Sequence, residues 1–197
     1  MDAKVREFIE SVTSQLSDLQ YIRPEEIPDI PLYMDQVTTF IDDQLSSSRR
    51  HSEDKTLTKT MINNYTKNDL LPPPDRKKYS KEHMLLLIII YYLKNFLSIS
   101  DIRSILAPLE EKYFGNKEGR NIEDVYSEVF RLEKAETAAL VKDLAKKFME
   151  AQKSFDDYPA EDQEFLHSFS FICMLSYDVY IKKMIIENMI DEMLEDK

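Results

Sequence analysis

Ten consecutive residues from Met84 to Leu93 are apolar, and this run (MLLLIIIYYL) is the strongest constraint on the fold. A helix that is apolar on every side must be covered on every side, so the run predicts the buried centre of a globular domain. A bilayer span needs about 20 apolar residues, roughly twice this length. Ser80 opens the helix, although Ser80 and His83 are not the Ser-x-x-Glu pair of a standard capping box.

A short polar helix precedes the apolar run and ends before the triple proline Pro72–Pro74. Thr58 stands where a helix needs an N-cap, and one face is apolar, with Leu57, Met61, Ile62 and Tyr65. The opposite face carries Lys59, Thr60, Asn63, Asn64 and Lys67. Asparagine can pair with N6 and N7 of adenine in the major groove, and lysine can meet phosphates. An ordinary solvent-exposed face is the alternative.

The prolines lead into a turn, PDRKKY, in which three consecutive cations stand beside a tyrosine. Such a loop suits a DNA phosphate backbone. Its position directly after the polar helix favours this interpretation over that of a solvated turn. Together the two elements predict a DNA-binding surface, whose candidate residues are Thr58, Lys59, Thr60, Asn63, Asn64, Tyr65, Lys67, Arg76, Lys77, Lys78 and Tyr79.

The distribution of charge supports this surface. The chain carries a formal net charge of −11, which by itself opposes binding to nucleic acid. Residues 49–95, however, hold ten Lys/Arg against five Asp/Glu, so this segment is +5 and the remainder is −16. A basic island in an acidic body is the electrostatic footprint expected of a local DNA-binding site.

Apolar residues at helical spacing predict further helices, so the expected fold class is all-α, that is, mainly helical. The predicted helices span about residues 3–20, 34–45, 122–153 and 161–195. A further helix begins at Ser98 or Ser100 and contains Pro108. Prolines 24, 28 and 31 indicate an extended linker. Residues 46–55 include no apolar side chain and indicate a mobile loop. The last helix is apolar over most of its circumference, so its own chain or a second copy should cover it.

Other function classes find little support. The three histidines, His51, His83 and His167, lack the spacing of a metal site, and the single Cys173 excludes an intrachain disulfide. The carboxylates lie on helical faces, and no catalytic constellation is visible. We therefore expect no enzyme, no metal and no cofactor. The charged N-terminus is not a signal peptide, and we expect a cytoplasmic protein with no membrane partner.

Three strings, LTKTMINNYTKNDLLPPP, KKYSKEHMLLLIIIYYLK and ISDIRSIL, resemble the bacterial family called DUF1836, which is placed near the MerR-type winged helix-turn-helix regulators. Leu57-Thr58 match the opening of the MerR pattern, and Asn64-Tyr65 match its tyrosine pair. Leu70-Leu71-Pro72 match the exit from the helix, Lys78-Tyr79-Ser80 the end of the wing, and Ser98–Ile102 the last element. The chain departs from the pattern at Asn63, where arginine is usual, and in a shorter wing. The turn at 46–56 is also far longer than the three or four residues of a standard motif.

The resemblance implies a MerR-like winged helix-turn-helix over residues 33–110. An N-terminal helix and Pro-rich linker (1–32) precede it, and a helical dimerisation and sensing region (111–197) follows. It implies a transcriptional regulator that binds double-stranded DNA as a homodimer, although no residues match those that bind an effector. The alternative is a helical protein-interaction or sensing protein whose winged helix is vestigial and binds no DNA.

Overall fold

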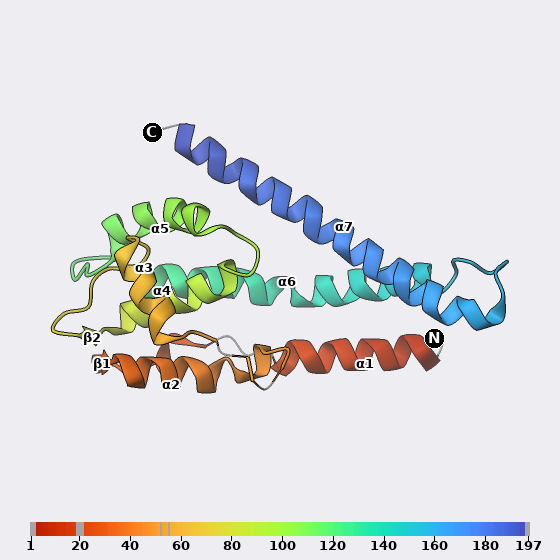
Figure 1. Cartoon of the computed structure of the whole chain (residues 1–197), viewed down its shortest axis with the longest axis horizontal. Coiled ribbons are helices and arrows are strands. Elements are labelled where there is room, and N and C mark those ends of the chain that lie inside the picture. The colour runs from red at the N-terminus through yellow and green to blue at the C-terminus, as the bar shows by residue number, and fades with distance from the viewer. Residues whose placement is uncertain (1–2, 19–21, 52, 55, 196–197) are drawn as a thin grey trace. The chain divides into compact units, whose positions relative to one another are not determined.

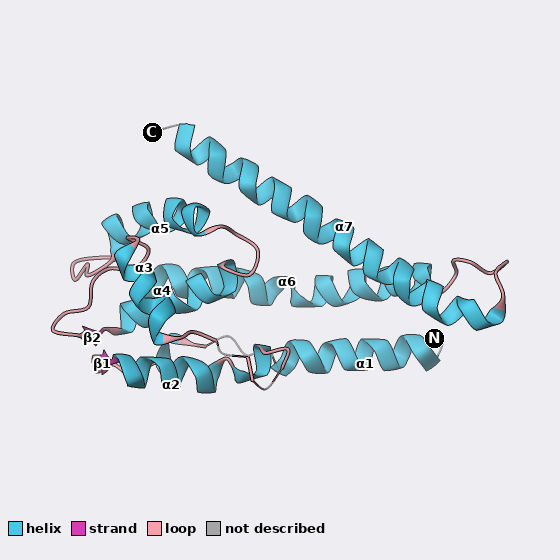
Figure 2. Ribbon diagram, in the orientation of Figure 1, coloured by secondary structure: helices cyan, strands magenta, loops and turns pink. Residues whose placement is uncertain are grey.

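The computed structural model describes residues 3–18, 22–51, 53–54 and 56–195 and is mainly helical, as predicted (Figures 1 and 2). The described helices are α1 (Ala3–Asp18), α2 (Met34–Gln44), α3 (Lys59–Lys67), α4 (Lys81–Leu93), α5 (Ile99–Tyr113), α6 (Ile122–Ala151) and α7 (Ala160–Glu195). Shorter elements are the 3₁₀ helices η1 (Pro24–Glu26) and η2 (Ser46–Ser48) and the strands β1 (Leu32–Tyr33) and β2 (Lys78–Tyr79). None of the described helices is long and apolar enough to cross a bilayer.

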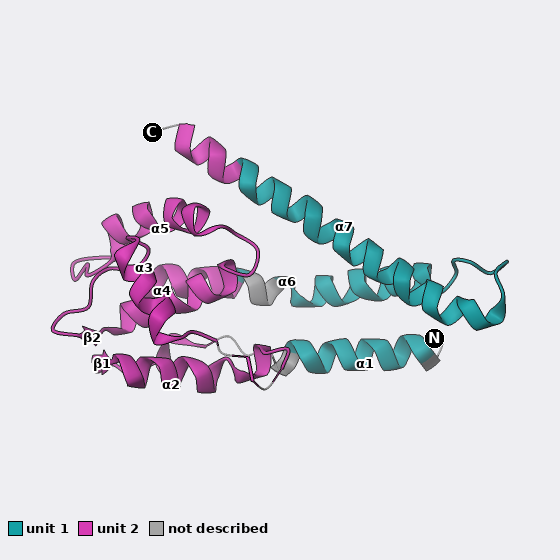
Figure 3. Cartoon of the chain, in the orientation of Figure 1, with its two compact units in different colours: residues 1–20, 132–188 teal, residues 21–131, 189–197 magenta. Residues whose placement is uncertain are grey.

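The chain divides into two compact units (Figure 3). Unit 1 comprises Met1–Gln20 and Leu132–Asn188, and unit 2 comprises Tyr21–Arg131 and Met189–Lys197. The long helices α6 and α7 each contribute to both units. All the residues predicted to contact DNA therefore belong to unit 2.

Helix α4 is the centre of unit 2, which confirms the prediction from its apolar run. All its residues from His83 to Ile88 are buried, and so are Ile90 and Tyr91. The other helices of unit 2 contribute further buried side chains, among them Val37, Ile41, Ile62, Ile102 and Leu106. Each fully buried aliphatic side chain of this size stabilises a fold by roughly 1.5–3 kcal/mol, so α4 and its neighbours dominate the stability of the unit.

The start of α4 uses an unexpected cap. The backbone N–H of Ser80 donates to Nδ1 of His83 at 3.0 Å, which is the contact that a glutamate makes in a capping box. The prediction that this pair forms no capping box was therefore wrong: a neutral imidazole nitrogen accepts a hydrogen bond as a carboxylate oxygen does. Burial lowers the pKa of His83, partly opposed by the carbonyls of Pro72 and Pro73, and so favours the neutral ring. Because a neutral ring can be buried, the cap also becomes part of the core, between the rings of Tyr79 and Phe114.

Four polar contacts hold the preceding linker, the residues after α5 and the beginning of α6 together within unit 2. The Lys81 ammonium lies 3.2 Å from Asp29 and 3.1 Å from Glu123. Glu82 accepts a hydrogen bond of 2.9 Å from the backbone N–H of Gly115, which has a positive φ of 71°. The buried hydroxyl of Tyr126 donates to the carbonyl of Ile22 at 2.7 Å. The unit therefore extends well beyond the last turn of α5.

Unit 1 is built around an aromatic cluster. Phe8 of α1 stacks on Phe148 of α6 with ring centroids 4.2 Å apart, and Phe171 of α7 meets both rings edge-on. Lys147 of α6 also bridges to Asp143 on the same helix and to Asp178 of α7. These contacts define which face of α7 is turned inward within the unit.

Helix α5 contains a carboxyl group in an unfavourable environment. Burial, together with the nearby carboxylate of Asp69, raises the pKa of Glu110 to about 7. Its buried Oε1 makes no hydrogen bond among the described residues. Asp69 itself is paired with Arg103 at 3.2 Å. Ionised Glu110 therefore opposes folding.

The raised pKa of Glu110 predicts that the effect of Glu110→Gln on the free energy of unfolding depends on pH. Between about pH 4.5 and 7 the unfolded chain releases a proton that folded Glu110 keeps, so the free energy of unfolding falls as the pH rises. At pH 8 Glu110→Gln should be more stable than the parent chain by about 1–3 kcal/mol, whereas at pH 4 it should gain nothing. Urea unfolding followed by circular dichroism measures the difference. The exposed neighbour provides a control, Glu111→Gln, and an equal gain at both pH values would contradict the assignment.

Candidate nucleic-acid interface

Helix α3 begins as the sequence predicts. The Thr58 hydroxyl accepts a hydrogen bond of 3.2 Å from the backbone N–H of Met61, so it is the N-cap. Beyond the cap, five of the predicted residues lie on the exposed face: Lys59, Thr60, Asn63, Asn64 and Lys67. Tyr65 is on the other face and is buried. The helix thus offers solvent a continuous polar surface while its apolar stripe is packed inside.

The end of α3 directs the chain away from the helix. The N–H of Leu70 donates to the carbonyl of Tyr65 at 2.9 Å, and the N–H of Asp69 to that of Thr66 at 3.4 Å. With Asp69 at φ 52°, these bonds form a Schellman motif in which an aspartate takes the usual place of glycine. Leu70 and Leu71 are buried, so the exit is attached to the core before the three prolines begin.

A tight turn follows at Asp75–Lys78. The N–H of Lys78 donates to the carbonyl of Asp75 at 2.8 Å, and the two central residues, Arg76 and Lys77, have φ values of 49° and 66°. Two successive positive φ values define a type I′ turn, which normally carries asparagine and glycine. A left-handed conformation costs other residues roughly 1–2 kcal/mol each. Both cations are exposed at the tip of this strained turn.

The last residue of the turn, Lys78, is also the first residue of strand β2, which connects the turn to the rest of unit 2. β2 pairs antiparallel with β1, with Tyr79 opposite Leu32 and Lys78 opposite Tyr33. Tyr79 is buried, whereas Tyr33 is exposed and its ring centroid lies 5.0 Å from the Lys78 ammonium. Tyr33 is a surface residue of this site that the sequence does not indicate. No local signal predicts it, because the strand pairing joins segments far apart in the chain.

The predicted residues therefore fall into three groups. Exposed side chains are Lys59, Thr60, Asn63, Asn64, Lys67, Arg76 and Lys77. Thr58 and Lys78 are partly exposed, and the Thr58 hydroxyl is engaged as the cap. Tyr65 and Tyr79 lie in the core, where burial raises the pKa of each hydroxyl. The tyrosines support the surface from beneath rather than form part of it.

Several cations of the basic island have internal partners. Arg49 is mostly buried, 2.6 Å from the Asp42 carboxylate, and also donates to the Asp42 carbonyl at 2.8 Å. Lys94 donates to the Thr56 carbonyl at 2.9 Å, and Lys59 forms an exposed ion pair with Asp35 of α2. By contrast, the described residues contain no ion-pair partner for Lys67, Arg76, Lys77 or Lys78. Apart from the exposed Arg50, the accessible positive charge is thus concentrated at the end of α3 and in the turn.

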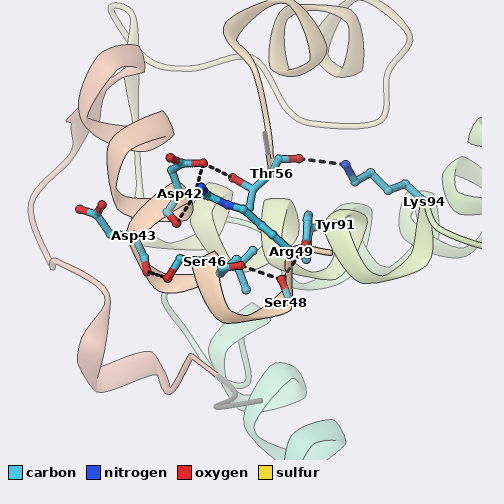
Figure 4. A network of polar contacts seen from close by, with 9 residues as sticks. Asp42, Asp43, Ser46, Ser48, Arg49, Thr56, Tyr91 and Lys94 are labelled. Carbon is cyan, nitrogen blue, oxygen red and sulfur yellow. Dashed lines mark hydrogen bonds and ion pairs between the residues drawn. The ribbon is translucent and has the colours of Figure 1, made fainter. Parts of the chain in front are cut away.

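The same contacts order the connection between α2 and α3 (Figure 4). Its first residues form η2, and the Ser48 hydroxyl lies 2.6 Å from the Tyr91 hydroxyl of α4. Near the other end, the buried Thr56 donates to Asp42 at 3.0 Å. The prediction of a mobile loop over 46–55 was therefore wrong for its first residues, because polar side chains hold them to α2 and α4. Residues 52 and 55 lie outside the described residues.

Two further features were sought around the site, a metal-ligating cluster and a cavity. Among the described residues, no group of three or more His, Cys, Asp or Glu side chains is placed to hold a metal ion. A shallow open cavity of about 430 Å³ lies between α2 and the start of α3, lined by Thr38, Thr39, Asp42, Asp43, Leu57, Thr58, Lys59 and Thr60. Its charged lining consists of Asp42 and Asp43, which are neighbours on α2, and of Lys59. The exposed face of α3 and the cationic turn remain the principal surface features of unit 2.

These features belong to a domain shared with other proteins. Residues 22–129 match the family described as Domain of unknown function (DUF1836), and this range covers more than half of the chain. The chain belongs to this family. The matched range includes α2 to α5, both strands and the turn, and it excludes α7. The search of curated proteins gave no match, and neither did the search of solved structures.

The strained turn generates a prediction about stability. Arg76→Asn/Lys77→Gly replaces two residues that resist the left-handed conformation with the pair that prefers it, so the free energy of unfolding should rise by about 1–2 kcal/mol. Urea unfolding measures the change. Arg76→Ala/Lys77→Ala removes the same charges but keeps the conformational cost, so its stability should stay close to that of the parent chain. Equal stability of the two double variants would contradict the strain.

Proposed function

We propose that α2, α3, β1 and β2 form a MerR-like winged helix-turn-helix, and that the protein is a transcriptional regulator that binds double-stranded DNA as a homodimer. The observation that supports this function is the exposed polar face of α3, followed by an ordered exit and a turn that presents two exposed cations. Figure 1 shows the loop that joins the two elements. A recognition helix and a wing require this combination.

In this proposal α3 enters the major groove. Asn63 and Asn64 are exposed and can pair with base edges, for which the two-point pairing of asparagine with adenine is the best fit. Lys67 at the end of the helix meets a phosphate. Arg76 and Lys77 contact the backbone beside the groove, where charge matters and base identity does not. Two copies read a site composed of two half-sites.

The long connection between α2 and α3 is compatible with this role. A helix-turn-helix needs a fixed angle between its two helices, which a short turn normally provides. Here the connection is long, but Arg49, Ser48 and Thr56 bind it to α2 and α4. Side-chain contacts can therefore replace the short turn in keeping α3 in place.

The DNA-binding proposal predicts different effects for the two elements. In anisotropy titrations against genomic fragments at two salt concentrations, Arg76→Ala/Lys77→Ala should weaken binding to all sequences. It should also reduce the slope of log K against log salt by about 2, since each phosphate contact contributes about 0.9. Asn63→Ala/Asn64→Ala should relax sequence preference and leave the slope unchanged.

Two exposed lysines of unit 1 provide the control, Lys142→Ala/Lys146→Ala, which removes the same charge from residues that are not part of the proposed surface. No binding of the parent chain at low salt would refute the function. An unchanged DNA affinity of Arg76→Ala/Lys77→Ala would refute the role of the turn as a wing.

A second candidate is a protein-interaction or sensing role with a vestigial winged helix. It is favoured by the pairing of Lys59 with Asp35, which neutralises a cation at the start of α3, and by the net charge of −11. The titration above separates the two, because this candidate requires that DNA binding be undetectable at both salt concentrations. A small-molecule effector is unidentified in either case.

A further inference from the structure

A second group of exposed cations lies between α5 and α6. Residues 114–121 read FGNKEGRN, and we call them the α5–α6 loop. Lys117, Glu118 and Arg120 are all exposed, and these two cations and one carboxylate give the loop a net charge of +1. Within the described part of the chain, Lys117 and Arg120 have no ion-pair partner. The proposed function leaves both cations unused.

Two hydrogen bonds give the α5–α6 loop a fixed shape. The Asn116 side chain donates to the carbonyl of Arg120 at 3.0 Å, and its Oδ1 accepts from the N–H of Glu118 at 3.1 Å. Gly115 and Gly119 have φ values of 71° and 125°, a range that glycine adopts readily and other residues resist. A loop that is ordered before binding loses less conformational entropy when its cations meet a partner.

The α5–α6 loop is attached beside the cationic turn. The Gly115 N–H donates to Glu82 at 2.9 Å, and the ring centroid of Phe114 lies 4.8 Å from that of His83. His83 also contacts Tyr79, with ring centroids 5.5 Å apart, and Tyr79 belongs to β2, the strand in which the turn ends. Figure 1 shows the loop and the turn at the same end of unit 2.

This spacing suits a single DNA duplex. Five residue steps separate Lys77 in the turn from Glu82, so their Cα atoms are at most about 18 Å apart. Gly115 is bonded to Glu82, and Lys117 follows it by two residues. One helical turn of B-DNA is about 34 Å long. The turn and the loop can therefore meet phosphates of one duplex within about one helical turn.

The carboxylates around the loop leave its cations available. Glu82, Glu123, Asp124 and Glu128 already have partners, which are the N–H of Gly115, the Lys81 ammonium, the N–H of Asn121 and the Arg131 guanidinium. The hydrogen bond from Arg131 chiefly lowers the pKa of Glu128, and Arg120 adds a smaller share. Exposed Glu111 and Glu118 remain to oppose an anionic partner, so Glu118 is a suitable position for a charge exchange.

We propose that the α5–α6 loop is a second backbone-binding element, in which Lys117 and Arg120 bind phosphates of double-stranded DNA beside those met by Arg76 and Lys77. This inference rests on the proposed function and extends its surface to a segment far from α3 in the sequence. Contacts between cationic side chains and phosphates fix how a protein lies on the duplex and carry no sequence information. The loop therefore helps to orient α3 in the groove and does not select the bases.

The role of the loop predicts a change in the salt dependence of DNA binding. In anisotropy titrations, Lys117→Ala/Arg120→Ala should reduce the slope of log K against log salt by about 2, since each phosphate contact contributes about 0.9. Combined with Arg76→Ala/Lys77→Ala, the loss should be about 4, because the two pairs of residues meet different phosphates. An unchanged slope for Lys117→Ala/Arg120→Ala overturns the proposal.

A gain of affinity excludes damage to the fold as the cause. Glu118→Lys adds a third cation to the loop and should raise both the affinity for DNA and the salt slope, the slope by up to about 1. Glu164→Lys makes the same charge change at an exposed residue of unit 1 and should leave both nearly unchanged. Equal gains in the two variants would show attraction through overall charge alone and overturn the proposal.

Chemical cleavage locates the loop on the duplex. With Cys173, the only cysteine, replaced by serine, an iron–EDTA reagent attached to Lys117→Cys should cut DNA beside the positions cut from Lys77→Cys. Cys173→Ser treated with the same reagent gives the background. Cuts from position 77 without cuts from position 117 contradict the contact and overturn the proposal.

The outcomes distinguish this inference from the function on which it rests. A parent chain that binds DNA with a salt slope insensitive to Lys117→Ala/Arg120→Ala refutes the role of the loop and leaves the proposed function intact. A parent chain that binds no DNA at low salt refutes both.

Discussion

Burial of α4 from His83 to Ile88, and again at Ile90 and Tyr91, is the constraint on which unit 2 depends. A helix apolar on all sides has no surface to give to solvent, so other elements must surround it. Helices α2, α3 and α5 differ in sequence, but each contributes buried side chains to the core of unit 2. The burial of α4 also explains why its cap is a histidine: the contact with the Ser80 N–H has to be made by a side chain that can remain in the core without charge.

Local patterns predict those parts of this fold that local physics controls. The sequence indicates the helices, the burial of α4 and the Thr58 cap, because periodicity and capping depend on residues three or four positions apart. Three features depend on long-range partners and could not be predicted: the β1–β2 pairing, the exposed Tyr33 beside Lys78, and the anchored connection at Ser48 and Thr56. The left-handed turn could not be predicted either, because Arg76 and Lys77 do not favour it.

Charge counted along the chain overstates the charge available at the surface. Residues 49–95 are basic in sequence, but Arg49 and Lys94 stabilise the connection before α3, and Lys81 joins the linker to α6. Apart from Arg50, what remains accessible is a smaller group of cations that follows the exposed asparagines of α3. A compact group of this kind suits contacts to a few neighbouring phosphates better than a broad electrostatic attraction.

The turn at Asp75–Lys78 has a consequence for how this sequence can change. Replacing Arg76 and Lys77 by residues that prefer positive φ removes strain, so selection for stability alone would tend to remove both cations. Their presence agrees with the proposed contact to phosphates, since strained residues cluster at binding sites. In this proposal, variation at these two positions among related chains reports whether the turn is used. Cations retained in spite of strain indicate a turn still in use, and Asn-Gly indicates a turn released from that use.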